Sequence, residues 1–199
     1  MFSRARLRRA SRLWPLLAVL VVIGLVVGLG GFARRTDMLR PAEPGTEIDS
    51  HNLVFTINTA TLQAVAPITG DTEWKVQVYG LVRNPGDEAL APILGPNGNF
   101  VLHDATSGLI AEAETVTLGA SGRRALVPPG NTTLPMTIDF TLPAGYAPQA
   151  EVELAVAQME HTANAVLGLN DGELVWNIDS YAPASLLRLP LTRLPDAPR

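Results

Sequence analysis

The chain has 199 residues, of which 15 are basic and 19 acidic, and its net charge at pH 7 is −4. Residues 36–199 hold all 19 acidic residues but only eight basic ones, so this part carries a net charge of −11. An acidic surface repels nucleic acid and anionic lipid, so neither is an expected partner of this part. The chain has no cysteine, which excludes thiolate metal sites and cysteine nucleophiles, and we expect no cofactor.

Residues 13–33 form an uncharged apolar run that is long enough to cross a bilayer. In a helix, this run spans roughly 31 Å, which matches the hydrocarbon core of a membrane. Trp14 suits the membrane interface at the start of the run. The apolar region of a signal peptide is shorter, about 7–15 residues. The length therefore favours an uncleaved anchor, and Gly31-Phe32-Ala33 would be the cleavage site in the alternative reading.

Arginine bias predicts the orientation of this anchor. Because the side richer in arginine stays in the cytoplasm, we expect residues 1–12 to form a cytoplasmic tail and the rest of the chain to lie outside the cell. Gly24 and Gly28 make a G-x-x-x-G pattern, which lets two membrane helices approach closely. The arginines that precede the run are Arg4, Arg6, Arg8, Arg9 and Arg12.

Residues 34–50 contain two prolines, several acids and little apolar material, which predicts a linker. A β-rich domain is expected at 51–194, followed by a short tail at 195–199. Period-two alternation of apolar residues predicts half-buried strands through most of this domain. The expected strand segments are 52–65, 73–84, 99–104, 109–118, 133–143, 150–159, 173–178 and 186–194.

Particular residues in these segments carry further expectations. Trp74 and Trp176 fall on the apolar faces of their strands, so both are expected in the core. Pro135 cannot donate a hydrogen bond to a strand ladder, which predicts a sheet edge or a strand start. The pattern as a whole predicts an all-β antiparallel sandwich of about seven or eight strands, preceded by one transmembrane helix.

The stretches "VQVYGLVRNPGD" (76–87), "LVPPGNTT" (126–133) and "IDFTLP" (138–143) resemble the telokin-like, immunoglobulin-like extracellular domains of Gram-positive bacteria. Those domains often follow a single membrane anchor or a lipid. The resemblance implies an immunoglobulin-like β-sandwich and an exported location. It carries over no catalytic residues, because the group has no common catalytic site.

The residues themselves predict no catalytic site. No serine lies in a G-x-S-x-G turn, which argues against a serine hydrolase. His103, Met159 and His161 could together form a soft site for copper, although separate histidines on the surface or at strand ends are the more common explanation. A carbohydrate platform would need exposed aromatic rings, and with Trp176 assigned to the core only Tyr79, Tyr146 and Tyr181 remain.

We therefore expect a single-span membrane protein with a non-catalytic extracytoplasmic domain. This domain would act as an accessory or scaffold subunit and bind another protein of the cell envelope. One alternative is a module that binds a ligand or a metal such as copper. A second alternative is a hydrolase without a recognisable motif.

The first prediction concerns topology. Protease added outside intact cells, after removal of the wall, should digest the domain and leave a small N-terminal fragment in the membrane. Immunoblotting with an N-terminal tag measures this fragment. Release of a mature form that begins near Arg34 would contradict the anchor.

Overall fold

The structure, a computed structural model, describes residues 38–66, 72–122, 124–143, 145–146, 149–163 and 174–196. All of these residues belong to one unit of the chain, Asp37–Arg199. They form strands and loops without a helix, and accordingly none of these described segments could cross a bilayer as a helix. The expected membrane helix at 13–33, with Trp14, Gly24, Gly28 and the arginines before it, lies outside the described residues.

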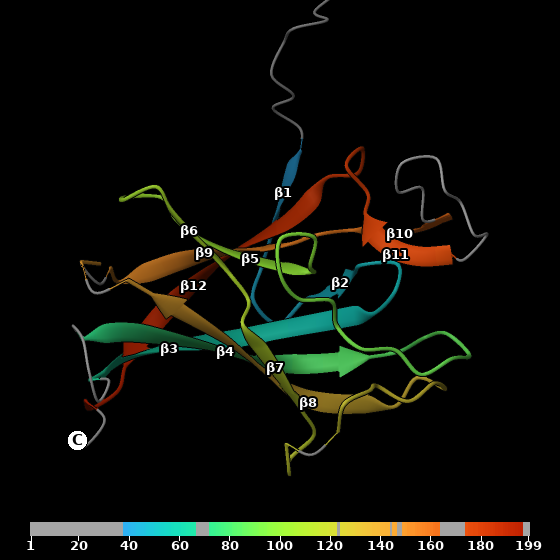
Figure 1. Cartoon of the computed structure of the whole chain (residues 1–199), viewed down its shortest axis with the longest axis horizontal. Helices are drawn as coiled ribbons and strands as arrows, with labels where there is room; N and C mark the ends of the chain where they lie inside the picture. Colours follow the sequence, from blue (N-terminus) through green and yellow to red (C-terminus); the bar gives the residue numbers. More distant parts are fainter. Residues whose placement is uncertain are drawn as a thin grey trace, which may run out of the picture. The chain divides into compact units, whose positions relative to one another are not determined.

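Ten of the twelve described strands pair into two sheets that share one long strand, β12 (Figure 1). The first sheet has the order β1-β12-β9-β5-β6, and the second has the order β3-β4-β8-β7 with β2 added to β3. The first part of β12 pairs with β9, and its last residues, Leu191–Arg193, pair with β3. A separate hairpin is formed by β10 and β11. The strands are β1 (Leu39–Ala42), β2 (Glu47–Asp49), β3 (Val54–Val65), β4 (Glu73–Arg83), β5 (Phe100–Asp104), β6 (Leu109–Glu112), β7 (Thr115–Leu118), β8 (Thr133–Leu142), β9 (Glu151–Val156), β10 (Met159–Ala163), β11 (Leu174–Ile178) and β12 (Ala184–Arg193).

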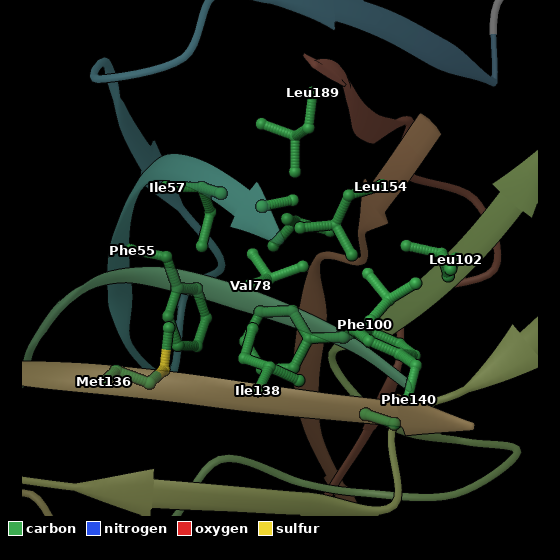
Figure 2. Close-up of a cluster of buried hydrophobic side chains, with 14 of the residues drawn as sticks. Phe55, Ile57, Val78, Phe100, Leu102, Met136, Ile138, Phe140, Leu154 and Leu189 are labelled. Carbon is green, nitrogen blue, oxygen red and sulfur yellow. The ribbon is translucent and has the colours of Figure 1, made fainter. Parts of the chain in front are cut away.

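The core lies between the two sheets and is built from alternate residues of the long strands (Figure 2). The rings of Phe55 on β3 and Phe100 on β5 meet edge to face with 4.8 Å between their centroids, which joins the sheets. The β-sandwich expected from the sequence is thereby confirmed, but it is not purely antiparallel, because β12 pairs in parallel with β1 and with β3. Its inward-facing residues on β4, β8 and β9 include Val76, Val78, Val82, Leu134, Met136, Ile138, Phe140, Val152, Leu154 and Val156.

A bulge in β3 explains why this strand alternates less cleanly in the sequence. The pairing with β4 shifts between Ile57 and Thr59, so that Asn58 and Thr59 are both exposed. Opposite the bulge, a Cβ atom on Gly80 would lie 2.4 Å from the Thr56 carbonyl oxygen. A residue without a side chain is therefore required at Gly80.

The number of strands is higher than the seven or eight expected. Two of the additional strands, β1 and β2, lie inside the range 34–50 that was expected to be a linker, and Ile48 of β2 is buried in the core. The run 109–118 forms two strands, because the chain passes from the first sheet to the second between β6 and β7. Short strands such as these have little apolar pattern of their own, and β1 also pairs with β12 at the far end of the chain.

Pro135 is the third residue of β8, near the start of the strand, and β8 is not at the edge of its sheet because it lies between β4 and β7. The backbone N–H of Gly119 donates to the Pro135 carbonyl at 2.8 Å, just beyond the end of the β7 ladder. The nitrogen and the carbonyl of a strand residue point toward the same neighbouring strand, so the Pro135 nitrogen also points toward β7 and not toward β4. The missing N–H of Pro135 therefore interrupts no bond between β8 and β4.

The expectation that both tryptophans lie deep in the core was wrong. Trp74 is partly buried at the start of β4, where it packs against the core and the Arg193 guanidinium lies 5.0 Å from its ring centroid. Trp176 lies on β11 in the separate hairpin, outside the core cluster. Period-two alternation identifies two faces of a strand but does not show which layer each face meets.

The second prediction concerns the core. Replacing Phe140 by alanine should lower the free energy of unfolding by about 3–5 kcal/mol, because the buried ring leaves a cavity. Urea unfolding of the purified protein measures this loss. Ile110→Ala on the solvent side of β6 should change the stability by less than about 0.5 kcal/mol. Equal losses in the two variants would contradict the assignment of the core.

Candidate functional site

A hollow of about 400 Å³ lies at the side of the domain where the hairpin meets two loops. Its walls come from the bend between β2 and β3, the loop that follows β4, and the facing residues of β10 and β11. The lining mixes an aromatic ring pair, two carboxylates, an amide and aliphatic groups. The residues are His51, Asn52, Pro85, Gly86, Asp87, Glu88, Leu90, His161 and Trp176.

His51 holds an unusual backbone conformation at the edge of the hollow. Its φ is 66°, in the left-handed region where a residue with a side chain is strained. Two contacts fix it there, since its N–H donates to Asp49 Oδ1 at 2.8 Å and its Nδ1 lies 3.1 Å from the Met159 carbonyl oxygen. Because a carbonyl only accepts, Nδ1 is the protonated nitrogen, and in the neutral ring Nε2 is an acceptor.

The floor behind His51 is a buried polar network centred on Asn99. The Asn99 Nδ2 donates to Ser50 Oγ at 3.0 Å and to Asn52 Oδ1 at 3.3 Å, and its Oδ1 accepts from the Ile93 N–H at 2.7 Å. Ser50 Oγ in turn donates to the Ala157 carbonyl. The side chains of Ser50, Asn52 and Asn99 are almost completely buried. This network ties the β2–β3 bend to the β4–β5 loop and to the end of β9.

A second buried asparagine shapes the loop that carries the carboxylates. The Asn84 Nδ2 donates to the carbonyls of Glu88 at 2.6 Å and Val127 at 3.0 Å, and its Oδ1 accepts from the Gly86 N–H at 3.0 Å. These bonds make an Asx turn and hold the loop on the neighbouring segment. Asp87 and Glu88 are therefore presented from a fixed backbone, while their side chains are exposed.

The hairpin supplies the aromatic wall. His161 and Trp176 are direct cross-strand partners, and their rings stack with 4.7 Å between centroids and 11° between planes. The same face of the hairpin carries Met159 and Ile178 at its base and Leu174 farther out. Met159 is fully buried, whereas Leu174 is 54% exposed. The aromatic pair thus lies where the hairpin leaves the core for solvent.

The structure does not bring together the residues considered for copper. His103 lies on β5 beside Glu153, Met159 is buried at the base of the hairpin, and His161 is stacked on Trp176. Across the described part of the chain, no three histidines or carboxylates are grouped as metal ligands. These positions give no support to the copper site.

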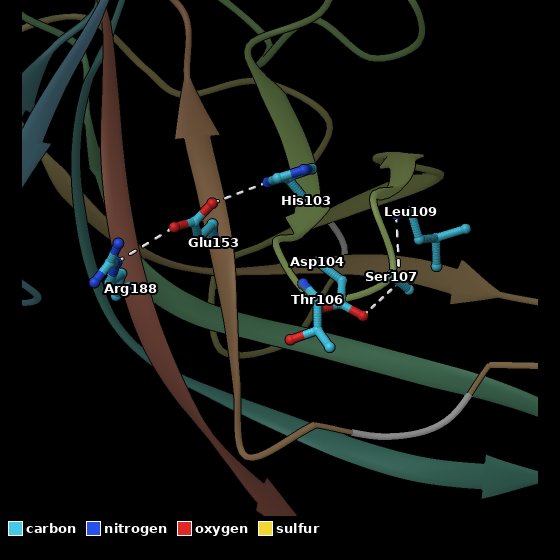
Figure 3. Close-up of polar contacts among 7 residues, drawn as sticks. All are labelled: His103, Asp104, Thr106, Ser107, Leu109, Glu153 and Arg188. Carbon is cyan, nitrogen blue, oxygen red and sulfur yellow. Dashed lines mark hydrogen bonds and ion pairs between the residues drawn. The ribbon is translucent and has the colours of Figure 1, made fainter.

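A second surface, the outer face of the first sheet, carries two cross-strand rows. In one row, Glu153 on β9 lies between His103 and Arg188 (Figure 3), with Nδ1–Oε2 and Nε–Oε1 distances of 2.9 and 3.3 Å. Ile110 on β6 is the partner of His103 and is 66% exposed. The next row contains four apolar residues, Val101, Ala155, Leu186 and Pro41, and ends at Glu112 on β6. We call these two rows, together with Leu39 on the same face of β1 as Pro41, the outer face.

Asp104 anchors the β5–β6 turn beside the outer face. Burial acts to raise the pKa of its carboxyl group, but the Ser107 hydroxyl, the N–H groups of Thr106 and Ser107, and nearby His103 act in the opposite direction. The balance places the pKa of Asp104 below its ordinary value of 3.8. The carboxylate therefore stays ionised and holds the turn at neutral pH.

Sequence reasoning missed most of the hollow. The sequence predicts the Asn84–Asp87 turn, but nothing in it places that turn next to the hairpin. No role was assigned to His51 from the sequence, although an Asp two residues earlier is a local signal for a side-chain-capped bend. Trp176 was assigned to the core because its strand alternates. Only the tertiary structure shows that these residues line one hollow.

No protein-family model matches the chain, and no curated protein matches it. Among solved structures, the chain is similar to an uncharacterized β-sandwich protein from Clostridium difficile 630, with a TM-score of 0.41 and 10% identity. The match covers 78% of this chain and 98% of that chain. A likeness this distant says nothing about function, and the site must be interpreted from its own residues.

The third prediction concerns Asp104 and pH. A carboxyl group whose pKa is lowered by folding adds stability above its unfolded pKa, and that stability is lost as the pH falls through the folded value. Ser107→Ala removes one of the bonds that lower the pKa, so the variant should be less stable than the native protein at pH 7. The difference should shrink below pH 3.8. Urea unfolding at several pH values measures it, and a difference that is independent of pH would contradict this role.

Proposed function

We propose that the chain is a membrane-anchored, extracytoplasmic protein whose immunoglobulin-like sandwich binds another protein of the cell envelope through the outer face of the first sheet. The domain would act as an accessory or scaffold subunit and not by turnover. The uncharged run at 13–33 and the arginines before it support the anchor.

One observation carries the choice of the outer face. On the solvent side of a sheet, polar residues usually alternate with the buried ones, yet here Val101, Ala155, Leu186 and Pro41 form an apolar row across four strands. Ile110 and Leu39 lie at opposite edges of this sheet and are 66% and 51% exposed. An apolar centre with a rim of polar and charged groups is typical of a protein-binding surface.

Charge and anchoring add two conditions to this proposal. The acidic outer part of the chain favours a partner surface that is neutral or basic. An anchor would hold the domain at the membrane and so raise the effective concentration of a partner that is held there too. We therefore expect the partner to be a membrane protein or a protein bound to the membrane surface.

The fourth prediction tests this surface in the full-length chain. The native protein, extracted from its own membranes in mild detergent, should co-purify with a partner. Ile110→Asp combined with Leu39→Asp should reduce the recovered partner about tenfold or more, since a buried unpaired charge costs several kcal/mol. Quantitative mass spectrometry of the purified complex measures the recovery.

A matched control is available on the other sheet. Leu81→Asp makes the same kind of change on the solvent side of β4, where Leu81 is 37% exposed, and should leave the recovery unchanged. Gly24→Leu with Gly28→Leu tests a contribution from the membrane helix separately. If the native protein purifies alone and cross-linking in intact membranes finds no partner, the accessory-subunit proposal fails.

A further inference from the structure

The hollow at the hairpin presents a different chemistry from the outer face and is not used by the proposed function. Its walls combine an aromatic surface, hydrogen-bond donors and hydrogen-bond acceptors within about 400 Å³. This size lies in the range of small-molecule sites, which are roughly 300–1,000 Å³. The following argument rests on the lining residues alone and does not depend on the protein-binding surface.

Asn52 supplies a donor that the described part of the protein leaves unused. The residue is 2% exposed and lines the hollow. Its Oδ1 accepts a hydrogen bond from Asn99, but among the described residues its Nδ2 has no hydrogen-bond partner. This nitrogen is open to the hollow, so a molecule that displaces water from it must accept its hydrogen bond or leave the donor unpaired. A ligand for the hollow must therefore carry acceptor oxygens.

The loop that follows β4 supplies acceptors. The carboxylates of Asp87 and Glu88 accept hydrogen bonds, and the Asn84 turn holds their backbone in place. In the neutral His51 ring, Nε2 is a further acceptor, because Nδ1 faces the Met159 carbonyl. A ligand must therefore also carry donors. The carboxylates would repel a ligand that is itself an anion.

The third requirement comes from the aromatic wall. Trp176 and His161 line the hollow as a stacked pair, and Leu90 and Pro85 add aliphatic surface beside them. Stacked rings on a hairpin and a loop pinned by Asn84 form a rigid apolar surface. A ligand that fits it needs a flat apolar face next to its polar groups.

We propose that this hollow binds a neutral saccharide. The hydroxyl groups of a pyranose both donate and accept, so they satisfy Asn52 as well as Asp87 and Glu88. The C–H face of the same ring packs on the indole of Trp176. A simple cation would pair with the carboxylates but would leave the Asn52 amide without an acceptor, and an acidic sugar would be repelled. From the sequence, Trp176 was assigned to the core, which left too few exposed aromatic rings for a carbohydrate site. In this proposal, Trp176 is the aromatic ring on which the sugar packs.

The test, which is the fifth prediction, uses the full-length chain in a detergent without a sugar headgroup. Maltose, cellobiose and diacetylchitobiose are the neutral probes, digalacturonate is the acidic probe, and arginine amide is the cationic probe. At least one neutral disaccharide should quench or shift tryptophan emission and release heat in calorimetry, with a Kd on the order of 1 mM. Digalacturonate and arginine amide should give neither signal.

Variants assign the binding to the hollow. Trp176→Ala and Asn52→Asp should each weaken the binding about tenfold or more, and Asn52→Asp keeps the oxygen that accepts from Asn99. Asp87→Asn with Glu88→Gln, at exposed positions, should weaken it without affecting folding. His103→Gln on the outer face should leave it unchanged. The proposal is overturned if no neutral probe binds up to about 10 mM, if arginine amide binds instead, or if the variants of the hollow bind like the native protein.

Discussion

The hydrogen bonds of the Asn99 side chain are the constraint on which the end of the domain around the hollow depends. A fully buried amide must satisfy its donors and acceptor inside the protein, and Asn99 does so with Ser50, Asn52 and the backbone of Ile93. Ser50 and Asn52 lie in the β2–β3 bend, whereas Asn99 and Ile93 lie in the β4–β5 loop. The network therefore forms only when this bend, this loop and the end of β9 have their native positions. An apolar side chain at this place would fill the space without fixing the loops.

The rest of the arrangement follows from how the two sheets are joined. In its first part β12 packs Leu187 and Leu189 into the core and presents Arg188 on the outer face, and then it continues onto β3. Because one strand belongs to both sheets, the outer face and the core cannot shift independently. The hairpin is different, since two strands alone are only marginally stable. Its buried base at Met159 ties it to the sandwich.

The long strands could be predicted from sequence because their two faces meet different surroundings. On β4 and β8, residues such as Val78 and Ile138 are fully buried while their neighbours are not, and the alternation is visible in the sequence. β1 could not be predicted because it pairs with β12, which lies at the other end of the chain. β2 could not be predicted because its only buried apolar residue is Ile48. For the hollow, the sequence predicts one turn, but it does not show that the residues of the three segments lie next to one another.

Trp176 shows why a correctly predicted strand can still lead to a wrong assignment of a residue to the core. Alternation correctly places it on the apolar face of β11, but that face turns toward a hollow and not toward the opposite sheet. The hairpin departs from the sandwich just after β9, where the Met159 N–H donates to the Ser50 backbone carbonyl at 3.1 Å. A long-range backbone bond of this kind leaves no trace in the sequence.

The backbone at His51 supports a binding role for this end of the domain. A glycine would adopt a φ of 66° with less strain, yet the chain holds an imidazole there with one bond to Asp49 and one to Met159. Strain of this kind persists only when the surroundings determine the conformation, and it concentrates at functional sites. Here both restraints act in the free protein, so the ring needs no rearrangement when a ligand enters. A wall fixed in advance loses little conformational entropy on binding. The buried amides, the pinned acidic loop and the stacked rings share this property, which distinguishes the hollow from an ordinary gap between surface loops.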